Sequence, residues 1–421
     1  MRISSLQAFN NGVAGLQRNY ANATRTQEQI STGNRILTPA DDPVASVRLL
    51  QLEQQQNVLS QYKSNLTAAN NSLTQEEVTL NSVNTVLHRV RELALRAGNG
   101  SLDPQDRQSI AAELREREDE LLSLMNTRNA RGEYLFSGFQ GKTQPFVRGP
   151  DGSYSYQGDE GQRKLQIASS LDIAISDSGK AVFENVTNAG RYTSNLDNTG
   201  AAPGSTLSVS APLVQDEVAV ASGFPPAGIG VHFTSATNYI VYELDNPPTD
   251  FSDPYAVPGQ VVGSGVVDED DRTADELIFS GVVIKFDGVP TGGETIEIEL
   301  DPNTQKQGIL DTIANLRMTL EDPTSSNADI RDVIAVSVTN LDHGMVSVDA
   351  ARGNIGARLN VIETTLTDNE DVALVNKSVQ AELRELDYAE ALSRLSFQTI
   401  ILEAAQQSYV KISGLNLFNR M

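Results

Sequence analysis

The chain contains no cysteine and no tryptophan, and only three histidines among its 421 residues. The absence of cysteine excludes disulfide frameworks, thiolate metal sites and cysteine nucleophiles. His88, His232 and His343 lie far apart in the sequence and lack the spacing of metal ligands. Without cysteine and with three scattered histidines, the sequence predicts no cofactor and no metal site.

Motifs of enzyme active sites are missing as well. The sequence has no GxSxG, no phosphate-binding glycine loop and no HExxH. Its densest run of acids, at positions 268–271, lacks the glycine and the spaced ligands of a calcium loop. We therefore expect no catalytic residues and no enzymatic activity.

The charge and the hydropathy exclude two classes of partner. A net charge of −23 argues against nucleic acid, whose recognition needs basic patches. No run of 18 apolar residues occurs, so the sequence predicts no membrane-spanning helix. The N-terminal residues lack the apolar core of a cleaved signal peptide, which by itself would indicate the cytoplasm.

The amino-acid composition changes twice along the chain. This division into flanks and a middle predicts an α+β fold. Both flanks are rich in Gln, Asn, Leu and Ala, whereas the middle holds most of the prolines and many short β-branched runs. We expect the flanks to form a long antiparallel helical rod of coiled-coil type, with an all-β domain inserted between them. The expected domains are terminal helices (1–40 with 377–421), a helical rod (41–138 with 303–376) and a β-rich insert (139–302).

Apolar residues spaced three and four apart predict long helices in both flanks. In residues 43–97, leucines recur every seven residues from Leu52 to Leu87, a heptad seam that would extend roughly 80 Å. In the C-terminal flank, one seam runs from Leu341 to Leu366. A second seam continues through Val372, Val375 and Val379 to Tyr409. Such seams predict that these helices pack against one another.

The helices at the two chain ends are the candidate assembly surface. Each is a single amphipathic helix that would bury little area by itself, so we expect both to be disordered in a free monomer and to fold on meeting partners. The interface residues that this predicts are Leu6, Phe9, Val13, Leu16, Tyr20, Ile30, Leu392, Leu395, Leu402, Tyr409, Leu415, Leu417 and Phe418.

The stretch TGNRILTPADDP, at positions 32–43, interrupts the helical register near the start of the chain. Gly33 suits the left-handed position that ends a helix. Asp42 and Pro43 have the order of an N-cap and a first helical residue, and Thr38 and Pro39 have the same order for a short turn before them. With Asp41, these residues predict a hinge with helix caps, whereas metal or catalytic use is the weaker interpretation.

Five segments of the two flanks stand out: MRISSLQAF at the start, QEQISTGNRILTPADDPVASVRLLQLE (27–53), RGEYLFSGF (131–139), LDYAEALSRLSFQ (386–398) and AAQQSYVKISGLNLFNRM (404–421). They resemble the flagellin superfamily, and within it the proteins that join hook to filament. The proline at position 43 and the GLNLF near the end favour the junction proteins over flagellin itself. The middle domain carries no motif that matches.

The resemblance implies a structural subunit of the bacterial flagellum that acts in motility. It implies type III export without a cleaved signal, hence a secreted, extracellular protein, which replaces the cytoplasmic interpretation above. It further implies a ring of about eleven subunits between hook-associated protein 1 and flagellin. A cytoplasmic export chaperone would hold the C-terminal helix before secretion.

Two alternatives remain open at this stage. The chain could be a flagellin filament subunit, in which case the purified protein would polymerise alone into long filaments. The middle domain could instead be a carbohydrate-binding or enzymatic module that the flanks deliver. Nothing in its sequence favours such a module over a solvated outer domain.

Overall fold

The computed structural model describes residues 2–100, 102–267 and 274–418, without the side chains of residues 2–6, 8 and 412–418. The acidic run at 268–271 lies outside the described residues. The chain forms two compact units. We call residues 1–67, 166–171 and 363–421 the terminal unit, and residues 68–165 and 172–362 the central unit.

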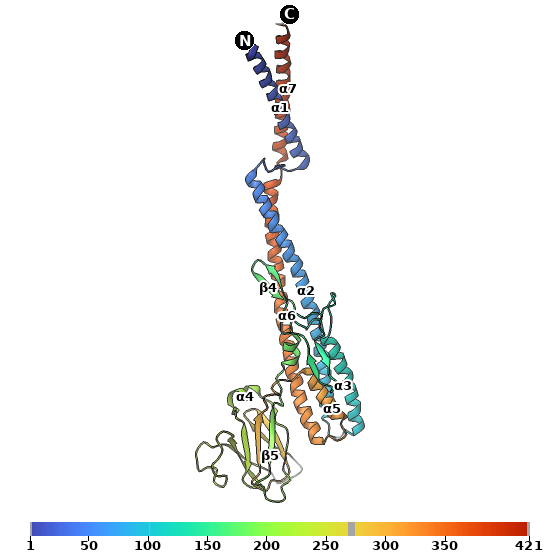
Figure 1. Cartoon of the computed structure of the whole chain (residues 1–421), viewed down its shortest axis with the longest axis vertical. Helices are drawn as coiled ribbons and strands as arrows, with labels where there is room; N and C mark the ends of the chain where they lie inside the picture. Colours follow the sequence, from blue (N-terminus) through green and yellow to red (C-terminus); the bar gives the residue numbers. More distant parts are fainter. Residues whose placement is uncertain (1, 101, 268–273, 419–421) are drawn as a thin grey trace. The chain divides into compact units, whose positions relative to one another are not determined.

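The terminal unit is built from helices. Helix α1 (Arg2–Thr32) and helix α7 (Tyr388–Phe418) lie side by side and antiparallel, with the two chain ends at the same end of the pair (Figure 1). Helix α2 (Pro43–Ala97) contributes its residues up to 67, and helix α6 (Asn327–Arg384) contributes its residues from 363 onward.

The heptad leucines of α2 form the core of the helical part of the central unit. Leu73, Leu80 and Leu87 are fully buried, and α2 spans the residues 43–97 in which the heptad seam was found. On α6, Val348 and Ile355 are fully buried in the same way. Helical flanks around a β-rich middle confirm the predicted fold class.

Helix α3 (Pro104–Met125) packs on helix α5 (Ile309–Glu321) around one buried carboxylate. Asp103 caps α3 by accepting the Asp106 N–H at 2.8 Å. Within the helix pair, Glu118 has no exposed side chain and accepts hydrogen bonds from Arg317 at 2.7 Å and Arg148 at 2.9 Å. A buried charge with two cationic partners stabilises the fold only while both remain.

Short elements connect these helices to the β domain. Strands β1 (Phe146–Arg148) and β2 (Tyr154–Tyr156) pair with each other, as do β3 (Lys164–Ala168) and β4 (Leu171–Ala174). A single π-helical turn, η1 (Lys180–Glu184), follows. None of these elements was predicted from the sequence, because each is short.

The β domain is a sandwich of two antiparallel sheets. The larger sheet has the order β10-β9-β8-β13-β5, and the smaller has the order β11-β12-β6 with β7 also paired to β12. The strands are β5 (Tyr192–Asp197), β6 (Ser208–Val209), β7 (Leu213–Val214), β8 (Ile229–Phe233), β9 (Asn238–Glu243), β10 (Val261–Val266), β11 (Asp275–Phe279), β12 (Val282–Asp287) and β13 (Thr295–Leu300), with a short helix α4 (Glu217–Gly223) after β7.

Aromatic side chains from both sheets fill the sandwich core. The rings of Phe233 on β8 and Phe286 on β12 meet edge to face with centroids 5.6 Å apart. The turn between β11 and β12 consists of Ser280 and Gly281, both with positive φ, which is the hairpin turn that matches the twist of paired strands. This core begins at Tyr192, so it accounts for only part of residues 139–302.

Two features of the C-terminal flank differ from the sequence prediction. The expected seam through Val372 and Val375 is not buried, since these side chains are 42% and 60% exposed, whereas Asn376 is 7% exposed. The predicted continuous pattern from 372 to 409 is also wrong, because α6 ends at Arg384 and α7 begins at Tyr388. Among the described residues, no helix has the length and apolarity needed to cross a bilayer.

Candidate assembly surface at the paired helix breaks

Gly33 ends helix α1 in the left-handed conformation. Its φ is +71°, and its N–H donates to the Gln29 carbonyl at 2.9 Å. A Cβ built at this position would lie 2.8 Å from the Tyr388 hydroxyl, which is closer than real Cβ contacts. The Tyr388 side chain is 52% exposed and can turn aside, so position 33 favours glycine chiefly for its backbone conformation.

The adjacent acids Asp41 and Asp42 both bind backbone N–H groups. Asp42 accepts the Ala45 N–H at 3.0 Å ahead of Pro43, which is the geometry of an N-cap followed by a first-turn proline. Asp41 accepts the N–H groups of Leu37 at 2.9 Å and Thr38 at 3.0 Å. The Thr38 hydroxyl also donates to Asp41, at 2.9 Å, so Thr38 is a donor here and not a cap.

An arginine of α1 completes the surroundings of Asp41. The guanidinium of Arg25 forms an ion pair with the Asp41 carboxylate, whose side chain is 9% exposed. Pro39 lies in the turn between Thr38 and Asp41, which is closed by a 3.0 Å hydrogen bond from the Asp41 N–H to the Thr38 carbonyl. Within the described ranges, no group of His, Cys, Asp or Glu side chains could hold a metal ion.

A second break, at residues 385–387, pairs with the first. The N–H of Arg35 donates to the Arg384 carbonyl at 2.8 Å, and the N–H of Leu386 donates to the Gly33 carbonyl at 3.0 Å. Asp387 then caps α7 by accepting the N–H groups of Ala389 and Glu390, at 2.9 and 3.1 Å. We call residues 33–42 and 385–387 the paired helix breaks.

Side chains reinforce the paired helix breaks. The Arg35 guanidinium donates to the Leu383 carbonyl at 3.1 Å, and Arg384 Nε donates to Asn34 Oδ1 at 3.2 Å. A groove of about 570 Å³ lies beside them, lined in part by Ile36 and Leu50. Sequence reasoning missed the second break, although the order Asp387-x-x-Glu390 is a helix-start signal.

Helices α1 and α7 contact each other along one face. The rings of Phe9 and Tyr409 have centroids 5.4 Å apart, and a Cβ at Gly12 would lie 3.5 Å from the Tyr409 ring. Of the predicted interface residues, those half-buried in this pair are Val13, Leu16, Ile30, Leu395, Leu402 and Tyr409. The side chains of Leu6, Leu415, Leu417 and Phe418 lie outside the described part of the structure.

The α1–α7 pair leaves much apolar surface in solvent. The predicted interface residues Phe9, Tyr20 and Leu392 are 46%, 64% and 52% exposed. Sequence reasoning missed Phe397 and Ile400, which are 65% and 63% exposed, because they lie off the seam that was followed. Exposed apolar side chains gathered on one element are typical of a surface that binds another protein.

Among the described carboxyl groups, the largest upward pKa shift belongs to one in the central unit. Glu76 of α2 is 1% exposed, and its Oε1 accepts the Asp177 N–H at 3.0 Å. Burial, and then the neighbouring charge of Asp177, raise the pKa of Glu76 from 4.5 to about 8. Asp177 in turn accepts two hydrogen bonds from Arg358 of α6, at 2.8 and 2.7 Å, so these groups form a buried structural network.

Comparison with known proteins shows what the chain resembles. Residues 3–141 match the family model described as the bacterial flagellin N-terminal helical region. The chain is 33% identical over 187 residues to flagellar hook-associated protein 3 of Salmonella typhimurium, which is 44% of this chain and 58% of that protein. The Escherichia coli protein of the same name is 32% identical over the same lengths. The alignments thus span less than two thirds of these relatives.

A solved structure covers more of the chain. The crystal structure of flagellar hook-associated protein 3 from Legionella pneumophila superposes with a TM-score of 0.62 at 26% identity. That superposition covers 79% of this chain and 98% of the Legionella chain. The similarity therefore extends beyond the N-terminal helices to most of the fold.

Proposed function

We propose that this chain belongs to the flagellin superfamily and is a structural subunit of the bacterial flagellum at the junction of hook and filament. The observation that carries this proposal is the similarity to hook-associated protein 3 in both sequence and fold. The paired helix breaks and the exposed apolar side chains of α7 support it, because they suit a subunit whose terminal helices bind other molecules.

In the proposed assembly, copies of the chain form a ring of about eleven subunits through head-to-tail contacts. Hook-associated protein 1 lies on one side of the ring and flagellin on the other. Residues 1–40 and 377–421 form the inner assembly layer, residues 41–138 and 303–376 the rod around it, and residues 139–302 the outer surface. The exposed Phe397 and Ile400 of α7 favour contacts through the inner layer.

The proposed location is extracellular, after export in an unfolded state through the flagellar type III apparatus. A cysteine-free chain suits this route, because no disulfide must form or break. Before export, a cytoplasmic chaperone would cover the apolar surface of α7. The same surface would then become the assembly interface, so the chaperone and the ring would compete for it.

We propose a purely structural role without catalysis. Two buried carboxylates of the described structure, each paired with arginine, support this proposal. Glu118 is held by Arg317 and Arg148, and Asp177 is held by Arg358, so these carboxylates are committed to ion pairs inside the fold. Neither is free to act as a general base.

The test is deletion of the gene, followed by electron microscopy of the hooks. We expect hooks without filaments, with flagellin released into the medium, and recovery when the intact chain is supplied again. Normal filaments in the deletion strain would contradict the junction role. A parallel assay of the purified chain separates it from flagellin, since spontaneous growth of long filaments would favour a filament subunit instead.

A further inference from the structure

The last turns of α6, residues 366–384, carry two faces that compete for the same neighbour. One face consists of Asn369, Ala373, Asn376 and Gln380, and we call it the amide face. The other consists of Val372, Val375 and Val379, and we call it the valine face. Both have the three-and-four spacing of a heptad seam, and they are offset by one residue, which is about 100° around a helix.

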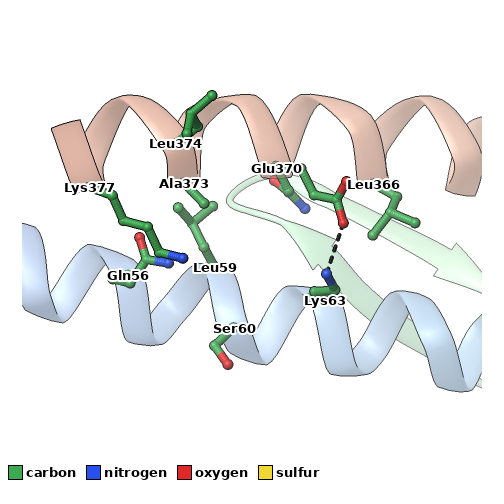
Figure 2. Close-up of a pocket in the computed structure, with 10 residues that line it drawn as sticks. Gln56, Leu59, Ser60, Lys63, Leu366, Glu370, Ala373, Leu374 and Lys377 are labelled. Atoms are coloured by element: carbon green, nitrogen blue, oxygen red, sulfur yellow. Dashed lines mark hydrogen bonds and ion pairs between the residues drawn. The ribbon is translucent and has the colours of Figure 1, made fainter.

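In the structure, the amide face lies against α2, whereas two of the three residues of the valine face are exposed and Val379 is half-buried. Asn376 is 7% exposed, whereas Val372 is 42% and Val375 is 60% exposed. Figure 2 shows this arrangement at the level of Leu59, which points from α2 toward Ala373, while Leu374 points away from α2. The burial is thus the reverse of what side-chain polarity favours.

The buried amide face is poorly satisfied. Nδ2 of Asn376, Nε2 of Gln380 and Oε1 of Gln56 on α2 are buried and have no hydrogen-bond partner among the described residues. Each such atom carries the cost of losing its water without a replacement. A cavity of about 340 Å³ lies between the two helices here, lined by residues that include Leu59 and Leu366, so the packing is also loose (Figure 2).

Between residues 366 and 380 few contacts hold this arrangement in place, whereas Leu383 and Arg384 are tied to the first helix break by three hydrogen bonds. Lys63 and Glu370 form an ion pair at 2.8 Å, but their side chains are 60% and 55% exposed, and such surface pairs contribute little. The Asn369 amide donates to the Ile167 carbonyl at 3.3 Å, which is a long hydrogen bond. Neither contact is strong enough to fix the helix against a competing face.

We propose that residues 366–384 of α6 rotate by about 100° between two states, one with the amide face and one with the valine face against α2. In the second state the valines are buried and the amides reach water. The sequence allows the rotation at both ends. Steps of three residues from Leu366 through Asn369 to Val372 permit a locally overwound turn. At the other end the helix stops at the break of residues 385–387, and the rotation breaks the hydrogen bonds that Leu383 and Arg384 form with Asn34 and Arg35.

The observations favour rotation over a bound partner. A second molecule on the valine face would cover Val372 and Val375 but would leave the amides of Asn376 and Gln380 buried and unpaired. Rotation removes both defects at once. It is also a property of the isolated chain, so it does not depend on the proposed role in the flagellum.

Cysteine pairs test the proposal cleanly, because the natural chain has no cysteine. Leu59→Cys is combined with one of three substitutions on α6. Ala373→Cys reports the observed state and Val372→Cys reports the rotated state. Leu374→Cys is the control, because position 374 faces α2 in neither state. The full-length protein is oxidised at low concentration, and disulfide formation within one chain is followed over time. We expect the 59–372 pair to form at least about ten times faster than the 59–374 pair.

A second pair of substitutions decides between rotation and general flexibility. Asn376→Leu with Gln380→Leu replaces the unpaired amides by apolar groups and so stabilises the observed state. In that background we expect the 59–372 disulfide to form about tenfold more slowly, while the 59–373 disulfide forms as before. Equal rates for the 59–372 and 59–374 pairs would overturn the proposal. Cross-links between chains instead of within one chain would overturn it too, in favour of a bound second copy.

Discussion

The β sandwich has a core of buried apolar side chains, whereas the terminal unit buries few of its own. In the sandwich, Phe233 and Ile298 are fully buried between two sheets. In the terminal unit, Phe397 and Leu374 are 65% and 68% exposed. A domain that buries its own apolar groups is stable alone, whereas one that exposes them gains stability when another molecule covers them.

The sandwich and the start of the terminal unit also differ in charge. Residues 191–302, which include the sandwich, hold eighteen acidic and three basic residues, whereas residues 1–40 hold one acidic and four basic residues. Like charges on neighbouring copies repel each other, and a strongly charged surface keeps a protein soluble. The sandwich thus favours contact with solvent, and the nearly acid-free first helix lacks a comparable barrier to association.

The largest expected effect is the loss of an aromatic ring from the sandwich core. Phe286→Ala removes a side chain that is 2% exposed and leaves a cavity, which costs about 3–5 kcal/mol of unfolding free energy. Hydrogen exchange of the β8 and β12 amides measures this loss, which is useful because the chain has no tryptophan to report on unfolding. The matched control is Ile278→Ala on β11, whose side chain is 63% exposed. A similar loss of protection in both variants would contradict a sandwich stabilised by its own core.

The second expected effect is a pH dependence centred on Glu76. Because the folded chain keeps the Glu76 proton until its pKa of about 8, while the unfolded chain loses it near 4.5, the folded state binds more protons between these values. The contribution of Glu76 to stability is therefore complete below the unfolded pKa and is lost as the pH rises toward 8, at about 1.4 kcal/mol per pH unit.

Glu76→Gln tests this dependence, because glutamine imitates the protonated acid. We expect the variant to lose the Glu76 part of the pH slope and to exceed the parent in stability at the alkaline end. The control is Glu77→Gln, which changes the next residue, a half-buried partner of Arg352 at 3.1 Å. Denaturant unfolding of the central unit at several pH values gives the slopes. An unchanged slope in Glu76→Gln would show that this carboxyl group is ionised in the folded chain.

A smaller effect is expected at the first of the paired helix breaks. Gly33→Val forces a β-branched residue into a positive φ and against the Tyr388 hydroxyl, which costs of the order of 1–3 kcal/mol. Hydrogen exchange should show less protection of the α1 and α7 amides. Gly15→Val is the control, because a Cβ there meets nothing within 4 Å and its backbone is helical. Normal protection in Gly33→Val would mean that the break tolerates other backbone conformations.

The sequence predicted the elements whose signal is long and repeated. Six heptads were enough to predict one long helix, because each leucine repeats the same information, and the capping residues at its two ends, Asp42–Pro43 and Gly98, gave the bounds of α2, Pro43–Ala97. Strands such as β8 and β10 were missed, since β8 is uniformly buried without alternation and β10 carries two glycines. The register of a sheet depends on partners far along the chain, which no local pattern reports.

The C-terminal flank shows a different limit. Apolar spacing selected Val372 and Val375 as core residues, yet the structure buries Asn376 beside them. Two seams offset by one residue cannot be ranked by spacing alone, because each satisfies the same periodicity. The second break was missed for a related reason, since the apolar pattern continues across Asp387 while the backbone does not.

Substitutions on the exposed face of α7 should have the smallest effect on the stability of the free chain. The same substitutions should have the largest effect on assembly. Phe397→Ala removes a ring that is already 65% exposed, so the unfolding free energy of the free chain should change by less than about 0.5 kcal/mol. If the terminal unit keeps its apolar surface for other subunits, the same substitution weakens filament attachment in the deletion strain. Val218→Ala in α4, 77% exposed on the sandwich, is the matched control and should leave attachment intact. Equal attachment in both variants would mean that exposure of apolar groups on α7 does not mark an interface. The contrast between the two regions would then reduce to a difference in stability alone.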